Sequence, residues 1–108
     1  MRILVAGFDT REEVNAAMDK FIAETGILMI TIVCGGLDSR HHNRSIAEEW
    51  ARDNGASVEY IFDKDSDKLV RKIVKTIDYA ILRRNGTKFI REIILEMRKN
   101  EKHGVVYN

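Results

Sequence analysis

The chain has 108 residues, 44% of them hydrophobic and 32% charged, which are the proportions of a folded soluble protein. This length predicts one domain spanning residues 1–108 with a single hydrophobic core. The net charge of +1 argues against a general polyanion-binding protein, although a local basic patch is compatible with a balanced total. Cys34 is the one cysteine, which excludes an internal disulfide.

The sequence predicts neither a secretory signal nor a membrane segment. Residues 1–2 are followed by only a short apolar stretch before Asp9, which is unlike a signal peptide. The longest apolar run, residues 27–34, falls far short of the roughly 18–20 residues that a membrane helix needs. We therefore expect a cytoplasmic protein with no membrane contact.

Apolar runs typical of strands alternate with segments of helical periodicity along the chain. Strands are predicted at residues 2–7, 28–34, 57–62, 79–82 and 104–107, and helices at 10–26, 45–54, 66–77 and 87–98. Right-handed crossovers place consecutive helices on the faces of a parallel sheet. The sequence therefore predicts a three-layer, Rossmann-like α/β fold with a five-stranded, mainly parallel sheet in the order 3-2-1-4-5 and about four helices.

Polar residues and glycine mark the expected helix ends. Thr10 and Glu13 have the spacing of a capping box, and Gly26 suits a left-handed C-cap. Ser66 is predicted to cap the third helix and Thr87 the fourth.

Three further features concern the core and the sheet edge. Trp50 is predicted to fill the core between helix and sheet. Cys34 is expected to be a small buried hydrophobe rather than a nucleophile. Residues 57–62 alternate in polarity, which predicts an edge strand.

In an open α/β sheet, the loops that follow the strands gather at one edge and hold ligands. Here that edge would bring together residues 7–9, 35–40 and 83–87. Glycines allow main-chain N–H groups to approach an anion, and the helix dipole adds attraction for phosphate. Five cations lie in or beside the same loops: Arg40, Arg44, Arg83, Arg84 and Lys88.

We predict main-chain donation to phosphate from Gly35, Gly36 and Gly86, and charge pairing from Arg40, Arg83 and Arg84. Asp38 and Arg44 are further candidate ligand-binding residues. Asp9 is expected either to contact a ribose hydroxyl or to cap the first helix. Plain turn chemistry also accounts for glycines at such positions. Neither a G-x-G-x-x-G fingerprint nor a P-loop is present.

His41 and His42, together with Asp38 and Cys34, come nearest to a metal-binding pattern. Adjacent histidines point in different directions, and no second Cys or His pair has finger-like spacing. We therefore predict no metal ion and no cofactor.

One combination of motifs resembles a known family. It comprises a strand ending in Ala-Gly-x-Asp, a second strand ending in Gly-Gly, and the segment Ile46-Ala47-Glu48-Glu49-Trp50-Ala51-x-x-x-Gly55. This pattern resembles the YspA-like, cpYpsA-related branch of the SLOG superfamily, which also contains the LOG phosphoribohydrolases and the DNA-binding DprA proteins. The resemblance implies a Rossmann-like fold and a site for a nucleotide derivative, with ligand contacts from Gly7, Asp9, Gly35, Gly36, Gly86 and Thr87.

Several features depart from the family pattern. Residues 37–44 form a longer loop that lacks the third glycine and has Arg44 at the acidic position. Arg83-Arg84-Asn85 precede Gly86-Thr87 where the family has Pro-Gly-Gly-x. Ile90 occupies the position of the catalytic glutamate of LOG enzymes, so the resemblance does not support hydrolase activity.

The resulting hypothesis is a sensor or sequestering protein that binds a nucleotide or nucleotide-derived ligand. One alternative is an enzyme that hydrolyses an N-glycosidic bond with the carboxylate of Asp9 or Asp38. Another is a nucleic-acid or protein interaction module that uses the cationic loops together with a cationic face of the third helix. That face carries Lys68, Arg71, Lys72 and Lys75 and is otherwise a solvated surface, with the contact to a polymer expected from Arg71, Lys72 and Lys75. An exposed edge strand is compatible with a homo-oligomer.

Overall fold

The computed structural model describes residues 1–37 and 45–108. Within these ranges the chain forms five strands and four helices. In order they are β1 (Arg2–Ala6), α1 (Arg11–Thr25), β2 (Thr31–Gly36), α2 (Ile46–Asp53), β3 (Ser57–Phe62), α3 (Ser66–Thr76), β4 (Tyr79–Arg83), α4 (Lys88–Lys99) and β5 (His103–Tyr107). No helix in these ranges combines the length and apolar character needed to cross a membrane.

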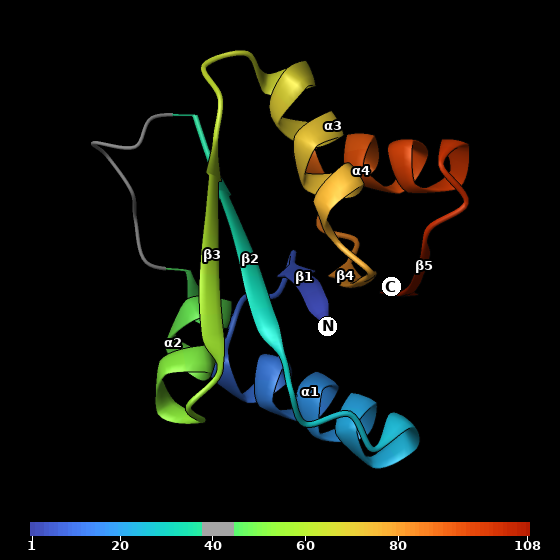
Figure 1. The fold of residues 1–108 in the computed structure, drawn as a ribbon. Coiled ribbons are helices and arrows are strands. Elements are labelled where there is room, and N and C mark those ends of the chain that lie inside the picture. Colours follow the sequence, from blue (N-terminus) through green and yellow to red (C-terminus); the bar gives the residue numbers. More distant parts are fainter. Residues whose placement is uncertain (38–44) are drawn as a thin grey trace.

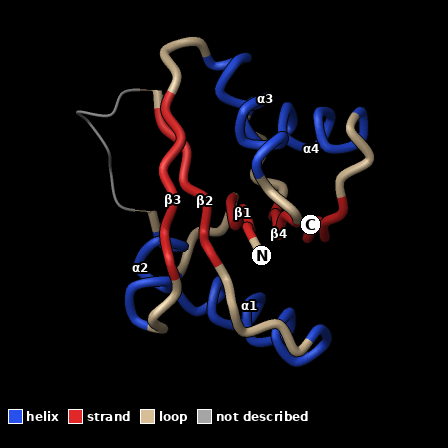
Figure 2. The backbone as a smooth tube through the Cα atoms, viewed as in Figure 1, coloured by secondary structure: helices blue, strands red, loops and turns tan. Residues whose placement is uncertain are grey.

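The strands form a parallel sheet in the order β3-β2-β1-β4-β5, which confirms the predicted fold class and strand order. Strand β3 lies at one edge, as the alternating polarity of its residues predicts. Helices α1 and α2 cover one face of the sheet, and α3 and α4 cover the other (Figure 1). The tube view shows the same three layers (Figure 2).

The side chains of each central strand divide between two core clusters. In β1, Ile3 and Val5 pack toward α1 and α2, whereas Leu4 packs toward α3 and α4. A strand that is covered on both faces has no solvated side, which explains its unbroken apolar sequence. Trp50 is 5% exposed and lies in the first cluster, as predicted.

Two helices have the predicted caps. The hydroxyl of Thr10 accepts a hydrogen bond of 3.2 Å from the N–H of Glu13, and Gly26 ends α1 in the left-handed conformation. The hydroxyl of Thr87 accepts from the N–H of Ile90 at the start of α4. These contacts satisfy N–H groups that have no acceptor within the helix.

The prediction that Ser66 caps α3 is wrong by one residue. Asp65 is the cap, and its carboxylate accepts from the N–H groups of Asp67 and Lys68 at 2.9 and 3.1 Å. A charged oxygen is a stronger acceptor than a hydroxyl and interacts favourably with the helix dipole. Ser66 consequently becomes the first residue of the helix.

Strand β2 begins later than the predicted residues 28–34. Leu28 and Met29 are 77% and 85% exposed, and pairing with β1 and β3 begins at Thr31. Apolar composition alone extended the prediction into the connection before the strand. The strand instead runs on through both glycines to Gly36.

Gly7 allows β1 and β4 to approach closely at their carboxyl ends. Its φ is 94°, and a Cβ at this position would overlap the carbonyl oxygen of Arg83. The overlapping atom belongs to the main chain of a paired strand, so it cannot move aside as a side chain can. The glycine is therefore required by backbone packing, whatever else this turn does.

We predict that Gly7→Ala lowers the free energy of unfolding by about 2–4 kcal/mol, the combined effect of overlap and of a positive φ. Gly26→Ala is the matched control, because Gly26 also has a positive φ but open space around it. The control should cost only about 1 kcal/mol. Urea unfolding measures both values, and equal losses would show that the contact with Arg83 is unimportant.

Candidate functional site

Strands β1 and β2 separate toward their carboxyl ends. Pairing between them stops at Ile3 and Ile32, whereas β1 continues along β4 to Ala6 and β2 continues along β3 to Gly36. Main-chain groups that would complete the ladder therefore face an opening between the two strands. Open α/β sheets hold ligands beyond the carboxyl ends of their strands, which is where this opening lies.

A pocket of about 230 Å³ occupies the opening. Its described walls come from β1, β2 and the turn after β1, from Val14 of α1, and from the start of α2 and α4. They include Phe8, Cys34, Ser45, Ala47 and Phe89. None of the described wall residues carries a charged side chain. The pocket is thus suited to an uncharged, largely apolar group that also hydrogen-bonds to main-chain groups or to a hydroxyl.

The turns that contain Gly36 and Gly86 lie at the same edge of the sheet, because β2 and β4 flank β1 and all three are parallel. Gly86 is exposed with a φ of 77°, and Thr87 follows it as the cap of α4. Arg84 and Lys88 are exposed beside this turn. Cationic side chains and the start of a helix therefore adjoin the pocket wall formed by Phe89.

Three predicted binding residues, Asp38, Arg40 and Arg44, lie outside the described residues, as do His41 and His42. In the part of the chain that is described, no group of three or more His, Cys, Asp and Glu side chains is placed to hold a metal ion.

Asp9 and Arg83, which were predicted to contact a ligand, are paired with each other. Arg83 Nη1 lies 2.8 Å from Asp9 Oδ2 and 3.2 Å from Glu13 Oε2. Neither Asp9 nor Arg83 lines the pocket, and Arg83 instead lines a groove between α1 and β5. Asp9 does not cap α1 either, because Thr10 does. The two charges join β4 to the turn after β1.

The glycines at the end of β2 lie within the strand rather than in a turn after it. Gly35 and Gly36 pair with Ile61 and Phe62 of β3. A Cβ at Gly35 would overlap the side chain of Ile73, so its absence lets α3 pack closely on the sheet. Gly35 therefore packs closely against Ile73 of α3, and it also contributes to the pocket wall.

Ile90, at the position of the LOG catalytic glutamate, is 3% exposed and packs in the core beneath α4. Its side chain takes part in packing the helix on the sheet rather than lining the described pocket walls.

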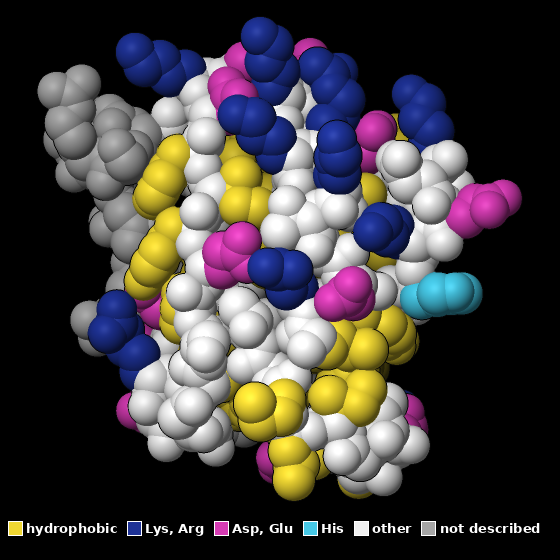
Figure 3. Space-filling view, viewed as in Figure 1, with side chains coloured by type: hydrophobic (Ala, Val, Ile, Leu, Met, Phe, Trp, Pro, Cys, Tyr) yellow, Lys and Arg dark blue, Asp and Glu magenta, His cyan; other side chains and the backbone are white. Residues whose placement is uncertain are grey.

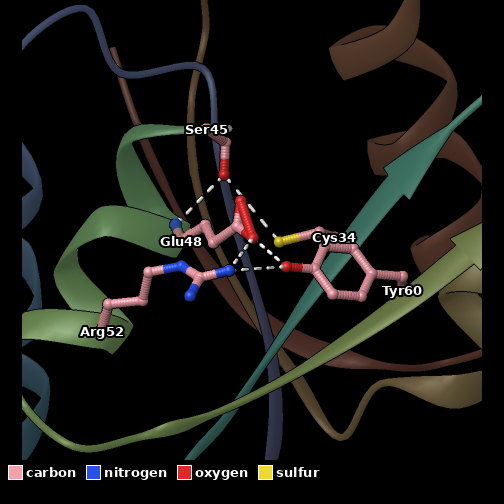
Figure 4. Close-up of polar contacts among 5 residues, drawn as sticks. All are labelled: Cys34, Ser45, Glu48, Arg52 and Tyr60. Carbon is pink, nitrogen blue, oxygen red and sulfur yellow. Dashed lines mark hydrogen bonds and ion pairs between the residues drawn. The ribbon is translucent and has the colours of Figure 1, made fainter. Parts of the chain in front are cut away.

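A polar cluster surrounds the buried carboxylate of Glu48, and two of its members, Cys34 and Ser45, belong to the pocket wall (Figure 4). Glu48 is 1% exposed, and its carboxylate accepts hydrogen bonds from the hydroxyl of Tyr60 and, at 3.2 Å, from Arg52. The hydroxyl of Ser45 accepts from the N–H of Glu48 at 3.1 Å and lies 3.9 Å from the sulfur of Cys34. The cluster joins the start of α2 to strands β2 and β3.

These contacts around Glu48 were not predicted from the sequence. Glu48 and Arg52 have the i, i+4 spacing of an ordinary exposed ion pair. The signal that could have revealed the burial is the position of Glu48 three residues before Ala51, which places it beside the apolar face of α2. A buried carboxylate needs hydrogen-bond partners. Because Tyr60 supplies one of them, the carboxylate of Glu48 holds α2 against β3.

Cys34 is 7% exposed, as expected for a small buried residue. Burial raises the pKa of its thiol, the hydrogen bond with Ser45 partly opposes that shift, and the nearby charge of Glu48 adds to it. The thiol is therefore uncharged at neutral pH, which fits a packing role. It nevertheless forms part of the pocket wall.

The fold and the opening define an open, doubly wound α/β domain with a pocket at the carboxyl ends of its strands. No protein-family model and no curated protein matches the sequence. Among solved structures, a universal stress protein from Archaeoglobus fulgidus in complex with dAMP matches over 99% of this chain and 96% of its own. The TM-score is 0.56 and the sequence identity is 17%, so the likeness shows a shared fold alone.

We predict that Tyr60→Phe lowers the free energy of unfolding by about 1.5 kcal/mol, because the buried carboxylate of Glu48 loses a donor. Urea unfolding measures the change. Tyr79→Phe is the matched control, since the hydroxyl of Tyr79 has no hydrogen bond within the described residues and its ring packs against Phe21. An equal loss in both variants would contradict a specific role for the Tyr60 hydroxyl.

Proposed function

We propose that the protein binds a nucleotide or nucleotide-derived ligand in the opening between β1 and β2. The observation that carries this proposal is the uncharged pocket at the carboxyl edge of the sheet, together with the exposed cation Arg84 and the start of α4 at the same edge. Lys88 is also exposed there but pairs with Glu92 at 3.5 Å. A nucleoside monophosphate has the same division between an uncharged base and sugar and a charged phosphate. The universal stress protein of similar fold was solved with dAMP, which supports a ligand of this class.

The size of the pocket indicates which part of the ligand enters it. Its volume of about 230 Å³ is below the roughly 300–1,000 Å³ of pockets that enclose whole drug-sized ligands. The base would enter between the strands, where Phe8 and Phe89 offer aromatic surface and the main chain offers hydrogen bonds. The phosphate would remain at the edge, near Gly86, Thr87 and Arg84, where it stays partly hydrated.

We further propose a sensor or sequestering role rather than catalysis. Cleavage of an N-glycosidic bond needs a carboxylate near the sugar. In the part of the chain that the structure describes, the pocket wall has none, and Asp9 is held by Arg83. Membership of the SLOG superfamily is part of the same proposal, supported by the helix signature of residues 46–51, whose first two residues line the pocket.

Phe89→Ala should weaken binding of dAMP about tenfold, because one aromatic contact with the base is lost. Leu95→Ala is the matched control: Leu95 lies on the same helix, is 62% exposed and is not part of the described pocket wall. Isothermal titration calorimetry with dAMP measures both affinities, and thermal unfolding checks that both variants are folded.

Titration of the wild-type protein with dAMP, deoxyadenosine and inorganic phosphate tests the proposal as a whole. Binding of dAMP in preference to both parts supports a site for base and phosphate together. Absence of binding by nucleoside monophosphates with any of the common bases would overturn the proposed function.

A bound nucleotide should also slow alkylation of Cys34. The thiol lines the pocket, and it is the one cysteine of the chain, so labelling reports on a single position. Since burial raises the pKa of the thiol, the rate should rise with pH above neutrality without levelling off at the ordinary thiol pKa. Iodoacetamide labelling followed by mass spectrometry, with and without saturating dAMP, measures the protection. Unchanged labelling at saturation would place the nucleotide outside this pocket.

A further inference from the structure

The outer face of α3 carries a stripe of four cations. Lys68, Arg71, Lys72 and Lys75 are all exposed and recur at i, i+3, i+4 and i+7. At 100° per residue this spacing places them on one side of the helix. In the space-filling view, Lys and Arg side chains gather over α3 (Figure 3).

The stripe lies directly opposite the core-facing side of the helix. Leu69, Val70, Ile73 and Val74 are buried against the sheet and α4, so the orientation of α3 is fixed by packing. Cations three and four residues apart repel one another and weaken a helix. Packing therefore holds together four like charges that the isolated helix would disfavour.

Internal partners account for little of this charge. Lys72 pairs with Asp63 at 2.7 Å, and the hydrogen bond from Lys72 is the main cause of the lowered pKa of Asp63. In residues 1–37 and 45–108, Lys68, Arg71 and Lys75 have no ion pair within 4.0 Å. Asp65 is already occupied as the helix cap, and Asp67 is the one acidic residue within α3 itself.

We propose that the cation stripe of α3 binds double-stranded nucleic acid through its phosphate backbone. Four cations at helical spacing cover about 10 Å of helix length, which is enough to contact several phosphates along one strand. This site is separate from the pocket, because no residue of α3 lines the described pocket walls. The proposal therefore stands independently of nucleotide binding.

The composition of the face favours a duplex over other polyanions. The exposed residues of α3 include no aromatic side chain that could stack on unpaired bases, as single-strand binding requires. They also include no apolar side chain that could enter a membrane surface, since every large apolar residue of α3 is buried in the core. Contacts to phosphate without contacts to bases give binding that tolerates any sequence.

Fluorescence anisotropy with a labelled DNA duplex of about 20 base pairs tests the proposal, with affinity measured over a range of salt concentrations. The triple variant Lys68→Gln, Arg71→Gln and Lys75→Gln should bind about tenfold more weakly or worse. Its slope of log affinity against log salt should be shallower by about two to three, because three phosphate contacts are lost. Lys72 is left in place so that its pair with Asp63 remains.

The matched control is Lys20→Gln, Arg98→Gln and Lys99→Gln, which likewise removes two lysines and one arginine, but from exposed positions on α1 and α4. The control should keep most of the affinity and the slope, and thermal unfolding should show both triple variants folded. An equal loss in the control would assign binding to net charge and overturn the proposal. Absence of duplex binding by the wild type at low salt would overturn it too, as would binding to vesicles with anionic lipid in preference to the duplex.

Discussion

The contact between the ends of β1 and β4 determines where the sheet can open. Gly7 lies against the carbonyl of Arg83, and the side chain of Arg83 reaches Asp9 and Glu13. β1 is therefore held to β4 from Ile3 to its carboxyl end. On its other side, β1 stops pairing with β2 at Ile3. Because the contact between β1 and β4 is rigid, it is β1 and β2 that separate, and the pocket lies between them.

The polar cluster around Glu48 holds in place the pocket wall that is formed by the start of α2. α2 stands at the mouth of the opening, and Glu48 with its partners Tyr60 and Arg52 ties it to β3. A short helix packed only by apolar contacts could shift along the sheet, whereas a buried carboxylate tolerates few arrangements. Both walls of the pocket are thus fixed before any ligand arrives, which lowers the ordering cost of binding.

The alternation of strands and helices made the fold class and the strand order predictable, and local chemistry predicted the caps at Thr10 and Thr87. Ion pairs between side chains far apart in the sequence were not predictable. The sequence shows Asp9 and Arg83 as two charged residues near a sheet edge, and only the fold shows that they form an ion pair with each other. Likewise, apolar composition cannot tell the exposed Leu28 and Met29 from a strand, because burial depends on which neighbours are present.

The near-neutral net charge is a sum over regions of the surface that differ sharply in local charge. Around the pocket, Arg83 is neutralised within the protein, while Arg84 remains exposed at the edge. Beside α3, Asp63 is paired with Lys72 and Asp65 serves as the helix cap. The other three cations of the outer face remain available to an approaching molecule. Since exposed charges are screened within about 10 Å at ordinary ionic strength, an approaching polyanion responds to that face and not to the total. A net charge of +1 therefore does not argue against local recognition of phosphate.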